Sequence, residues 1–475
     1  MEKKTHASRS SSLSRRSFLG ATLSSIGLTG AALTIPAAAK AQTVLGEELM
    51  LADLRGSLDV SSYGVRPGAV DNQSAAFQEA VNRAAADGQP LFVPAGDYLV
   101  SNIDLPSGLT LVGVPGQSRI RYAGDGHLMF ATGVSNIRLE GLVLDGNNRP
   151  LADYAPALLH ISTGVNISVE DCMILGSLKD GVMFDRVAGR IETCTIAGII
   201  GAAFVSNDAQ GLTVADNVVT DCADNGILIH RWSEGRDATR VTGNRIERIR
   251  AASGGTGPFG NGINVFRADE VLIANNTLHD CDFSAIRCNA ASNMQVVANH
   301  CTASGETALF AEFGFQGAVI ANNIIDDAAS GIVVTNFLDG GRMGVVQGNI
   351  VRNLTGQSRH PTEEPIYGVG IGAEADTVVT GNVVENAPQS GINAGWGPYL
   401  RNVIISQNVI RRTPIGTQVS VVDGVGPSII TDNIFEDTPE GAIVGMHWLE
   451  RATGDLTKTN SIPDTLTIDG NRTLT

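Results

Sequence analysis

The sequence comprises 475 residues, with 33 Lys and Arg against 49 Asp and Glu, and its net charge is −16 at pH 7. Nucleic-acid binding and attachment to anionic lipid both depend on clustered Lys and Arg, so this charge balance argues against either partner. The six cysteines form no CxxC pair and have no metal-ligand spacing with His. We expect them to be mostly buried, small apolar residues.

The N-terminal segment has the features of an export signal. A run Ser14-Arg15-Arg16-Ser17-Phe18-Leu19-Gly20 precedes a mildly apolar stretch and the small residues Ala39-Lys40-Ala41. This pattern predicts a twin-arginine signal peptide over residues 1–41, followed by a linker over residues 42–58. Retention as a membrane anchor is the alternative, but a membrane span needs roughly 20 strongly apolar residues. Removing residues 1–41 would change the net charge from −16 to −21.

The location and export partner follow from this signal. We expect a bacterial protein that meets the twin-arginine translocase during export and is then periplasmic or secreted, with no membrane attachment after cleavage.

Residues 59–112 are predicted to form an N-terminal cap and the first strands. In the amphipathic stretch after Ser74, a plausible N-cap, the residues Phe77, Ala80, Val81 and Ala84 share one face, and Gly88 follows its end. A helix laid across the first coil of a solenoid would block edge-to-edge association of its strands.

Residues 113–475 repeat a phrase of the form apolar-x-x-Asn-apolar. Its Asn recurs at separations of 22 residues or more, at positions 217, 244, 276, 299, 323, 349, 382, 408, 433 and 471. Cys172 and Cys194 replace it in two earlier copies. At a sharp turn Asn can adopt left-handed backbone angles, and its amide can bond its equivalents in the coils above and below. We therefore expect an internal asparagine ladder.

A second phrase, Gly or Ala followed by apolar-x-apolar, comes about ten residues after many of these Asn positions, as in Gly226-Ile227 and Gly391-Ile392. Both phrases have the two-residue period of strands. Short strands that repeat every 20 to 30 residues or so predict coils of two or three strands, stacked ~4.8 Å apart. The pattern indicates an all-β solenoid of about a dozen coils.

Residues 60–100 contain Tyr63-Gly64-Val65, Ala76-Phe77-Gln78-Glu79-Ala80 and Val93-Pro94-Ala95-Gly96-Asp97-Tyr98. These phrases resemble the opening of the pectate-lyase-like superfamily, and with the leader and the Asn repeats nearly the whole chain is similar to a family of twin-arginine-translocated repeat proteins. The resemblance implies a right-handed parallel β-helix with an N-terminal α-helical cap. It is uninformative about chemistry, because the superfamily hosts lyases, hydrolases, epimerases and non-catalytic adhesins.

The second phrase also predicts which side chains face outward. Its two apolar residues point inward, so the alternate positions form two outward columns. The first outward column should contain Met183, Val205, Leu228, Asn264, Arg287, Phe310, Val333 and Asn393. The second outward column should contain Asp185, Asn207, His230, Phe266, Asn289, Glu312 and Thr335.

Three residues of these columns are candidate catalytic groups. Arg287 and Glu312 fall on neighbouring coils, where Arg287 could clamp a substrate carboxylate and Glu312 could act as a base or as a cation ligand. The alternative is a surface salt bridge of little energetic worth. His230 is a candidate acid or base, with a solvated surface histidine as its alternative.

The same coils offer candidate contacts to a sugar polymer. Flat rings such as Trp232, and also Trp396, could stack on sugar faces, with turn packing as the alternative. The predicted substrate-binding residues are Asp185, Asn207, Arg231, Trp232, Asn264, Phe266, Arg267, Asn289 and Phe310.

No cofactor is required by these assignments, and no metal ligands are assigned. The acidic cluster Asp208, Glu234, Asp237, Asp269 and Glu270 is a candidate for holding Ca²⁺, with solvated turn acids as the alternative.

The expected partner is therefore a polysaccharide, bound at the outward columns and processed there if the protein is an enzyme. Asp185 and Glu312 lie five coils apart, on the order of 24 Å, which is too far for the paired carboxylates of a glycoside hydrolase. A lyase or epimerase is thus favoured if the protein is an enzyme, although its acidic surface counts against a uronate substrate. The alternative is a non-catalytic glycan-binding or structural envelope scaffold.

Overall fold

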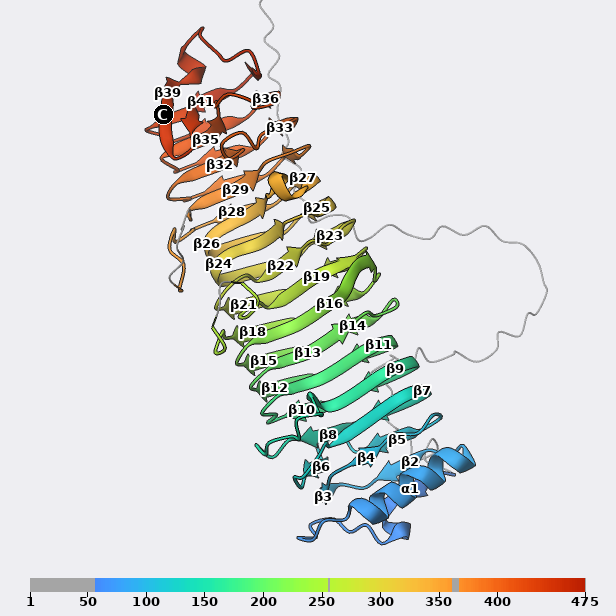
Figure 1. Cartoon of the computed structure of the whole chain (residues 1–475). Helices are drawn as coiled ribbons and strands as arrows, with labels where there is room; N and C mark the ends of the chain where they lie inside the picture. Colours follow the sequence, from blue (N-terminus) through green and yellow to red (C-terminus); the bar gives the residue numbers. More distant parts are fainter. Residues whose placement is uncertain (1–55, 255–256, 361–366, 475) are drawn as a thin grey trace, which may run out of the picture. The chain divides into compact units, whose positions relative to one another are not determined.

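The structure is a computed structural model that describes residues 56–254, 257–360 and 367–474. The predicted signal peptide (1–41) and most of the predicted linker (42–58) lie outside the described residues, so export by the twin-arginine route stays a prediction. The described residues form about 14 coils that stack along one axis, as Figure 1 shows. None of their helices is long and apolar enough to cross a membrane.

Each coil contributes strands to three parallel sheets, because the two-residue period of the repeat is interrupted by turns at regular places. The first sheet carries the two outward columns. Its strands are β4 (Ile103–Asp104), β7 (Met129–Glu140), β9 (Ala157–Glu170), β11 (Asp180–Glu192), β13 (Ala202–Asn207), β16 (Asn225–Arg236), β19 (Ile263–Asp269), β22 (Ile286–Asn289), β24 (His300–Glu312), β26 (Ile324–Val334), β29 (Val369–Ala373), β32 (Ser390–Ala394), β35 (Ile415–Ser420) and β38 (Gly441–His447).

The second sheet also receives the later parts of β7, β9 and β11. Its other strands are β1 (Leu58–Asp59), β2 (Leu91–Val93), β5 (Thr110–Gly113), β14 (Thr213–Ala215), β17 (Arg240–Thr242), β20 (Leu272–Ala274), β23 (Met294–Val297), β25 (Gln316–Ala321), β27 (Arg342–Gln347), β30 (Val378–Thr380), β33 (Val403–Ser406), β36 (Ser428–Thr431) and β40 (Leu466–Asp469).

The third sheet follows the asparagine turn and receives the first parts of β24 and β26. Its other strands are β3 (Gly96–Val100), β6 (Ser118–Tyr122), β8 (Leu142–Asp145), β10 (Met173–Leu175), β12 (Thr195–Ile199), β15 (Val218–Cys222), β18 (Arg245–Ile249), β21 (Thr277–Cys281), β28 (Ile350–Arg352), β31 (Val383–Glu385), β34 (Val409–Arg411), β37 (Ile434–Glu436) and β41 (Arg472–Leu474).

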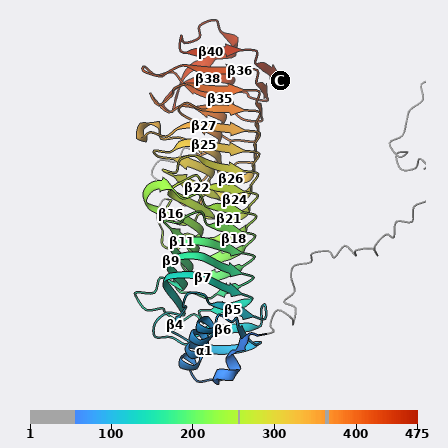
Figure 2. The same cartoon turned by 90° about the vertical axis from the view of Figure 1, so that its right-hand side faces the viewer.

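Inward-facing aliphatic residues of the three sheets fill the interior. Ile227, Val241 and Ile246 are fully buried within one coil, and a single apolar cluster runs from Val60 to Leu466. Figure 2 shows the strands of successive coils lying one above the other. At the C-terminal end, β39 (Glu450–Asp455) breaks the pattern by running antiparallel to β38.

The predicted asparagine ladder is present. The Nδ2 of Asn276 donates to Oδ1 of Asn299 at 2.9 Å, and Asn299 donates in the same way to Asn323 at 3.0 Å. The same bond joins consecutive Asn positions from 217 to 471. Cys194 extends the ladder, since its backbone N–H donates to Asn217, and all six cysteines are buried and free.

The prediction that the ladder asparagines themselves adopt left-handed backbone angles is wrong. The residue before the ladder position has the positive φ, for example Asn275 at 58°, Asn322 at 58° and Gly348 at 66°. The ladder Asn therefore keeps an ordinary backbone, and its inward side chain and backbone N–H both bond the next coil. The outward-facing neighbour makes the sharp turn instead.

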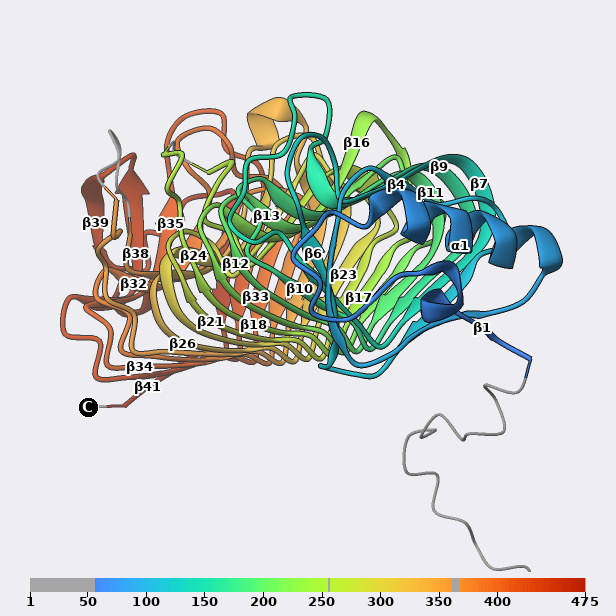
Figure 3. The same ribbon diagram turned by 90° about the horizontal axis from the view of Figure 1, so that it is seen from below.

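Helix α1 (Ser74–Asp87) lies against the first coil, and Figure 3 shows it crossing the blue end of the structure. Its buried face is Phe77, Ala80, Val81 and Ala84, as predicted. Ser74 is the first helical residue rather than the N-cap, because its hydroxyl accepts from the backbone of Ser101 at 2.7 Å. Gln78 bonds both the N–H and the C=O of Asp104 at 2.8 Å, so the helix satisfies part of the strand edge.

Within residues 56–254, 257–360 and 367–474 the other helices are short 3₁₀ turns at Val60–Tyr63, Phe337–Asp339 and Leu456–Lys458.

Candidate functional site

The strand register confirms both outward columns. Leu228, Asn264, Arg287 and Phe310 stand in line on consecutive coils in the first outward column. In the second outward column the pairing runs Asp185, Asn207, His230, Phe266, Asn289 and Glu312.

Arg287 and Glu312 form a buried ion pair. The Nε of Arg287 lies 2.5 Å from Oε1 of Glu312, and its Nη2 lies 3.0 Å from Oε2. The third donor, Nη1, contacts Oε2 of Glu306 at 3.1 Å. The side chain of Glu312 is only 4% exposed, so the alternative of a surface salt bridge is wrong. Burial arises because Glu306 closes one side and the backbone at Gly257 lies so near that a β-carbon there would collide with the guanidinium.

Two predicted substrate-binding residues, Asn289 and Phe310, contact this ion pair. Asn289 donates to Oε1 of Glu312 at 3.1 Å, and the ring of Phe310 lies under the guanidinium, 5.1 Å from its carbon. Burial raises the pKa of Glu306, partly offset by the charge of Arg287. Two carboxylates share one guanidinium here, so the cluster of Glu306, Arg287 and Glu312 holds an excess negative charge when both are ionised.

His230 does not join this cluster. Three coils separate it from Glu312 in the register, which corresponds to about 14 Å. It is half-buried with its ring edge-on to Phe266 at 5.8 Å, and burial lowers its pKa to about 4. The alternative of a solvated surface histidine is therefore wrong, and the ring is neutral at pH 7.

Asp185 and Asn207 belong to a different group. Asn207 donates to Oδ1 of Asp185 at 2.8 Å, and Nε2 of His160 lies 2.8 Å from Oδ2. His160 precedes Met183 in the first outward column and was not predicted, although Leu159-His160-Ile161 has the apolar-x-apolar form of the repeat. The amide of Asn264 is buried in the same column.

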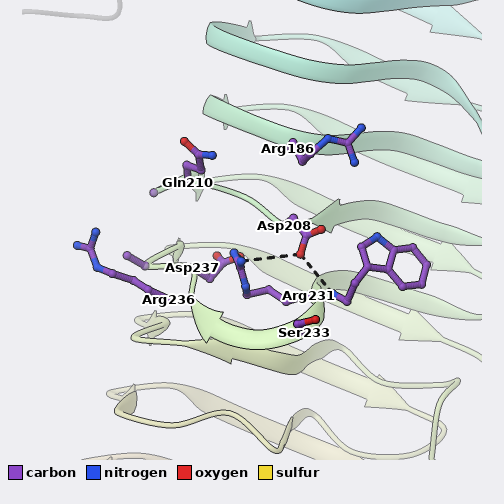
Figure 4. Close-up of a pocket in the computed structure, with 10 residues that line it drawn as sticks. Arg186, Asp208, Gln210, Arg231, Ser233, Arg236 and Asp237 are labelled. Atoms are coloured by element: carbon purple, nitrogen blue, oxygen red, sulfur yellow. Dashed lines mark hydrogen bonds and ion pairs between the residues drawn. The ribbon is translucent and has the colours of Figure 1, made fainter.

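Arg231 and Trp232 line a hollow of about 690 Å³, here called the arginine pocket. Its walls come from the turns that follow the second outward column, and Figure 4 shows the polar side chains around it. The lining residues are Arg186, Asp208, Gln210, Gly211, Arg231, Trp232, Ser233, Arg236, Asp237 and Ala238. Arg267 stands beside it and donates to the carbonyl of Trp232 at 3.1 Å.

A second hollow of about 370 Å³, here called the glutamate pocket, adjoins the buried ion pair. Its lining includes two buried carboxyl groups, Glu306 and Glu374, together with the rings of Phe310, Tyr367 and Trp396. The other lining residues are Thr307, Val333, Thr335, Asn336, Val369, Gly372, Ala373 and Asn393.

Glu374 is the most perturbed acid of the glutamate pocket. Burial raises its pKa to about 7, although the backbone N–H groups of Phe337 and Asn336 partly oppose the shift. The contact to Phe337 is 2.7 Å long. A carboxyl group with this pKa can either donate or accept a proton near neutral pH.

Sequence reasoning missed Glu374, although the signal was present. Gly370-Ile371-Gly372-Ala373-Glu374 has the form of the second phrase, and Ala373 pairs with Val334, which pairs with Ala311. Glu374 therefore continues the second outward column two coils beyond Glu312, on the order of 10 Å away. Glu306 carries no such signal, because it lies before the phrase at a bend of β24.

The acidic cluster considered as a candidate for Ca²⁺ is not arranged as a metal site. Among the residues that the structure describes, no group of three or more His, Cys, Asp or Glu is arranged to hold a metal ion. Asp237 is buried beneath Arg231, whereas Glu270 bonds Arg236 at 2.8 Å.

Comparison with known families identifies the architecture. Residues 233–410 match a family model described as a right-handed β-helix region. Residues 57–223 match one described as rhamnogalacturonase A/epimerase, pectate lyase-like. The fold is a right-handed parallel β-helix. The similarity of its N-terminal part to the pectate-lyase-like model supports the predicted superfamily. No curated protein matches the sequence.

Solved structures share this β-helix at low sequence identity. The N-terminal fragment of bacteriophage Phi29 gene product 12 is 17% identical over 89% of this chain and 71% of its own, with a TM-score of 0.51. The catalytic unit of the GH87 α-1,3-glucanase of Streptomyces thermodiastaticus is 15% identical over 88% and 70%, with a TM-score of 0.47. The A-module of mannuronan C-5 epimerase AlgE6 of Azotobacter vinelandii is 14% identical over 88% and 100%, with a TM-score of 0.46. These likenesses concern the fold alone.

Proposed function

We propose that this β-helix binds a polysaccharide along its outward columns and modifies it by acid–base catalysis in the glutamate pocket. The observation that carries the proposal is the pairing of buried carboxyl groups with half-buried aromatic rings in one hollow. Glu306 and Glu374 supply the ionisable groups, and Trp396 and Tyr367 supply flat apolar surface for a sugar ring.

Glu374 is the proposed proton donor and acceptor. Its pKa of about 7 leaves both protonation states populated at neutral pH. The neighbouring cluster of Arg287, Glu306 and Glu312 supplies a fixed charge distribution at the other end of the pocket. The three donor nitrogens of Arg287 are already engaged, so the clamp role predicted for it would require one carboxylate to release it.

The reaction class depends on how the substrate lies between these groups. Glu312 and Glu374 are two coils apart, at or just beyond the carboxyl spacing of inverting hydrolases. Proton abstraction by Glu374 alone, as in a lyase or epimerase, needs no second carboxylate. The assay must therefore distinguish hydrolysis, elimination and epimerisation.

The test incubates the purified protein with neutral and acidic polysaccharides, with and without Ca²⁺. Reducing ends report cleavage, absorbance of unsaturated uronate reports elimination, and proton NMR reports epimerisation. Glu374→Gln should lower the rate by about 100-fold or more, and Trp396→Ala should weaken substrate binding. Glu436→Gln, in the third sheet and 39% exposed, is the matched control and should retain the full rate. Full activity of Glu374→Gln would overturn the catalytic assignment.

A non-catalytic glycan-binding scaffold is the second candidate. The observation in its favour is Trp232, which is 72% exposed beside the arginine pocket. Binding to a polysaccharide without any change in the polymer would support this function over the first.

A further inference from the structure

The arginine pocket exists because β16 is longer than its neighbour. His230 pairs with Phe266 and Gly235 pairs with Ala268, so five residues of β16 cover a distance that two residues of β19 cover. The extra residues bulge outward and carry Arg231, Trp232 and Ser233 to the rim of the hollow. No other member of the second outward column is followed by three consecutive residues that line this pocket.

Arg231 is incompletely paired within the pocket. Its Nη1 donates to the carbonyl of Ala209 at 3.3 Å. Its contacts with carboxylates are longer than a hydrogen bond, because Nη2 lies 3.9 Å from Oδ1 of Asp208 and Nη1 lies 3.9 Å from Oδ2 of Asp237. Figure 4 shows the guanidinium beside Asp208 and Asp237. Among the described residues its Nε has no hydrogen-bond partner, and neither has Oδ2 of Asp237, whose side chain is fully buried. Burial raises the pKa of Asp237, so burial disfavours its negative charge.

Arg186 provides a second cation at the opposite wall. Its guanidinium donates to the hydroxyls of Thr163 at 3.2 Å and Ser162 at 3.1 Å. No carboxylate of the described residues lies within ion-pair distance of it, whereas Arg236 is paired with Glu270. An exposed, unneutralised arginine is notable in a chain whose net charge is −16.

Trp232 adds an exposed apolar face on an anchored backbone. Its backbone N–H donates to Asp208 at 3.2 Å, and its carbonyl accepts from Arg267 at 3.1 Å. The backbone is thus fixed from both sides while the indole stays 72% exposed. A solvent-facing ring on an anchored backbone, lining the same hollow as two arginines, is the combination that binds a sugar ring with an anionic substituent.

We propose that the arginine pocket binds an oxyanion-bearing sugar unit, with Arg186 and Arg231 on the oxyanion and Trp232 on the sugar ring. The shared chemistry is a carboxylate or a sulfate ester attached to a sugar. Gln210 and Ser233 are placed to bond its hydroxyl groups. The proposal rests on the proposed function only in taking a glycan as ligand, and it requires no catalysis. It also specifies where an acidic protein can hold an acidic polymer despite long-range repulsion.

The test is titration calorimetry of the full protein with three oligosaccharides of equal length. These are an oligogalacturonate, the same oligomer after reduction of its carboxyl groups, and a sulfated neutral oligosaccharide. We expect the oligogalacturonate to bind at least tenfold more tightly than its reduced form, with an affinity that falls as salt is added. If the sulfated ligand also binds, the pocket is a general oxyanion site. If the sulfated ligand does not bind, the pocket is specific for carboxylates. Equal affinity for the oligogalacturonate and its reduced form would overturn the proposal.

Variants locate the binding. Arg186→Ala and Trp232→Ala should each weaken oligogalacturonate binding by about tenfold, because both side chains are exposed and their removal leaves the fold intact. Arg352→Ala, an exposed arginine on the third sheet that pairs with Asp326, removes the same charge elsewhere and should change nothing. Unchanged binding by Arg186→Ala would contradict the assignment even if Arg231→Ala failed to fold.

The two proposals fail in different ways. Glu374→Gln should abolish turnover and leave oligogalacturonate binding intact, since about five coils separate Arg231 from Glu374, on the order of 24 Å. If the wild-type protein binds the oligogalacturonate but turns over no polysaccharide, only the catalytic proposal is contradicted. If the protein turns over a neutral polymer but its binding does not depend on an oxyanion, only the arginine-pocket proposal is contradicted.

Discussion

Arg287 meets Glu312 in a two-point contact, with Nε 2.5 Å from Oε1 and Nη2 3.0 Å from Oε2, inside a region where neither side chain exceeds 10% exposure. Glu306 takes the remaining donor. Removing one partner of a buried ion pair leaves an uncompensated buried charge. The resulting loss in free energy of unfolding exceeds the small stabilisation that a surface ion pair provides.

Arg287→Ala should therefore destabilise the protein by about 3–5 kcal/mol, because two buried carboxylates lose their common cation. Urea denaturation at pH 7 measures the loss. Arg352→Ala, whose pair with Asp326 is 50% and 25% exposed, should cost less than about 1 kcal/mol. Similar losses for both variants would mean that the Arg287 cluster is effectively solvated.

Glu374→Gln should stabilise the protein at pH 8 and leave it nearly unchanged at pH 4.5. The folded-state pKa is raised from 4.5 to about 7, so the native state favours the protonated carboxyl. That contribution is complete below about pH 4.5 and is lost as the pH rises through 7. The gain at pH 8 should approach about 3 kcal/mol. Thermal unfolding at the two pH values tests this, and a pH-independent difference would refute the shifted pKa.

His230→Phe should reduce the acid sensitivity of the fold. Burial lowers the folded-state pKa from 6.5 to about 4, so the native state favours the neutral ring. Its contribution is present above pH 6.5 and is lost as the pH falls toward 4. Between pH 7 and pH 4 the wild type should lose about 2 kcal/mol more than the variant. Parallel stability curves for the two proteins over this range would show that His230 titrates normally.

Asn299→Ala should cost about 2–4 kcal/mol, because it interrupts the ladder and leaves the buried donors of Asn276 without an acceptor. Asn471→Ala, at the half-buried end of the ladder, should cost less, since fewer groups lose partners there. Guanidinium denaturation compares the two variants. Equal costs would indicate that the ladder bonds do not depend on burial.

Much of the fold was predictable from local patterns. The two-residue period identified the inward residues, and the recurring Asn identified every ladder position from 217 to 471, because each coil must turn at the same place. The buried face of α1 followed from helical spacing in the same way. The Ser74 cap and the left-handed asparagines were wrong because tertiary partners, the Ser101 N–H and the next coil, took over those side chains.

The candidate site was predictable only in part. The column members, including the neighbouring Arg287 and Glu312, follow from the repeat, because register in a parallel stack is set by which residues face the core. Glu374 was not predicted, because the long segment between Thr335 and Val369 interrupts the regular spacing of the repeat.

The sequence by itself thus determined the solenoid, its ladder and the order of its outward side chains, since these depend on short-range periodicity. Only the tertiary structure decided that Arg287 and Glu312 are buried, that Glu306 joins them, and that Arg186 and Arg231 face one hollow. Those outcomes depend on how unequal loops fold over neighbouring coils, where side chains 19 or more residues apart in the sequence come into contact.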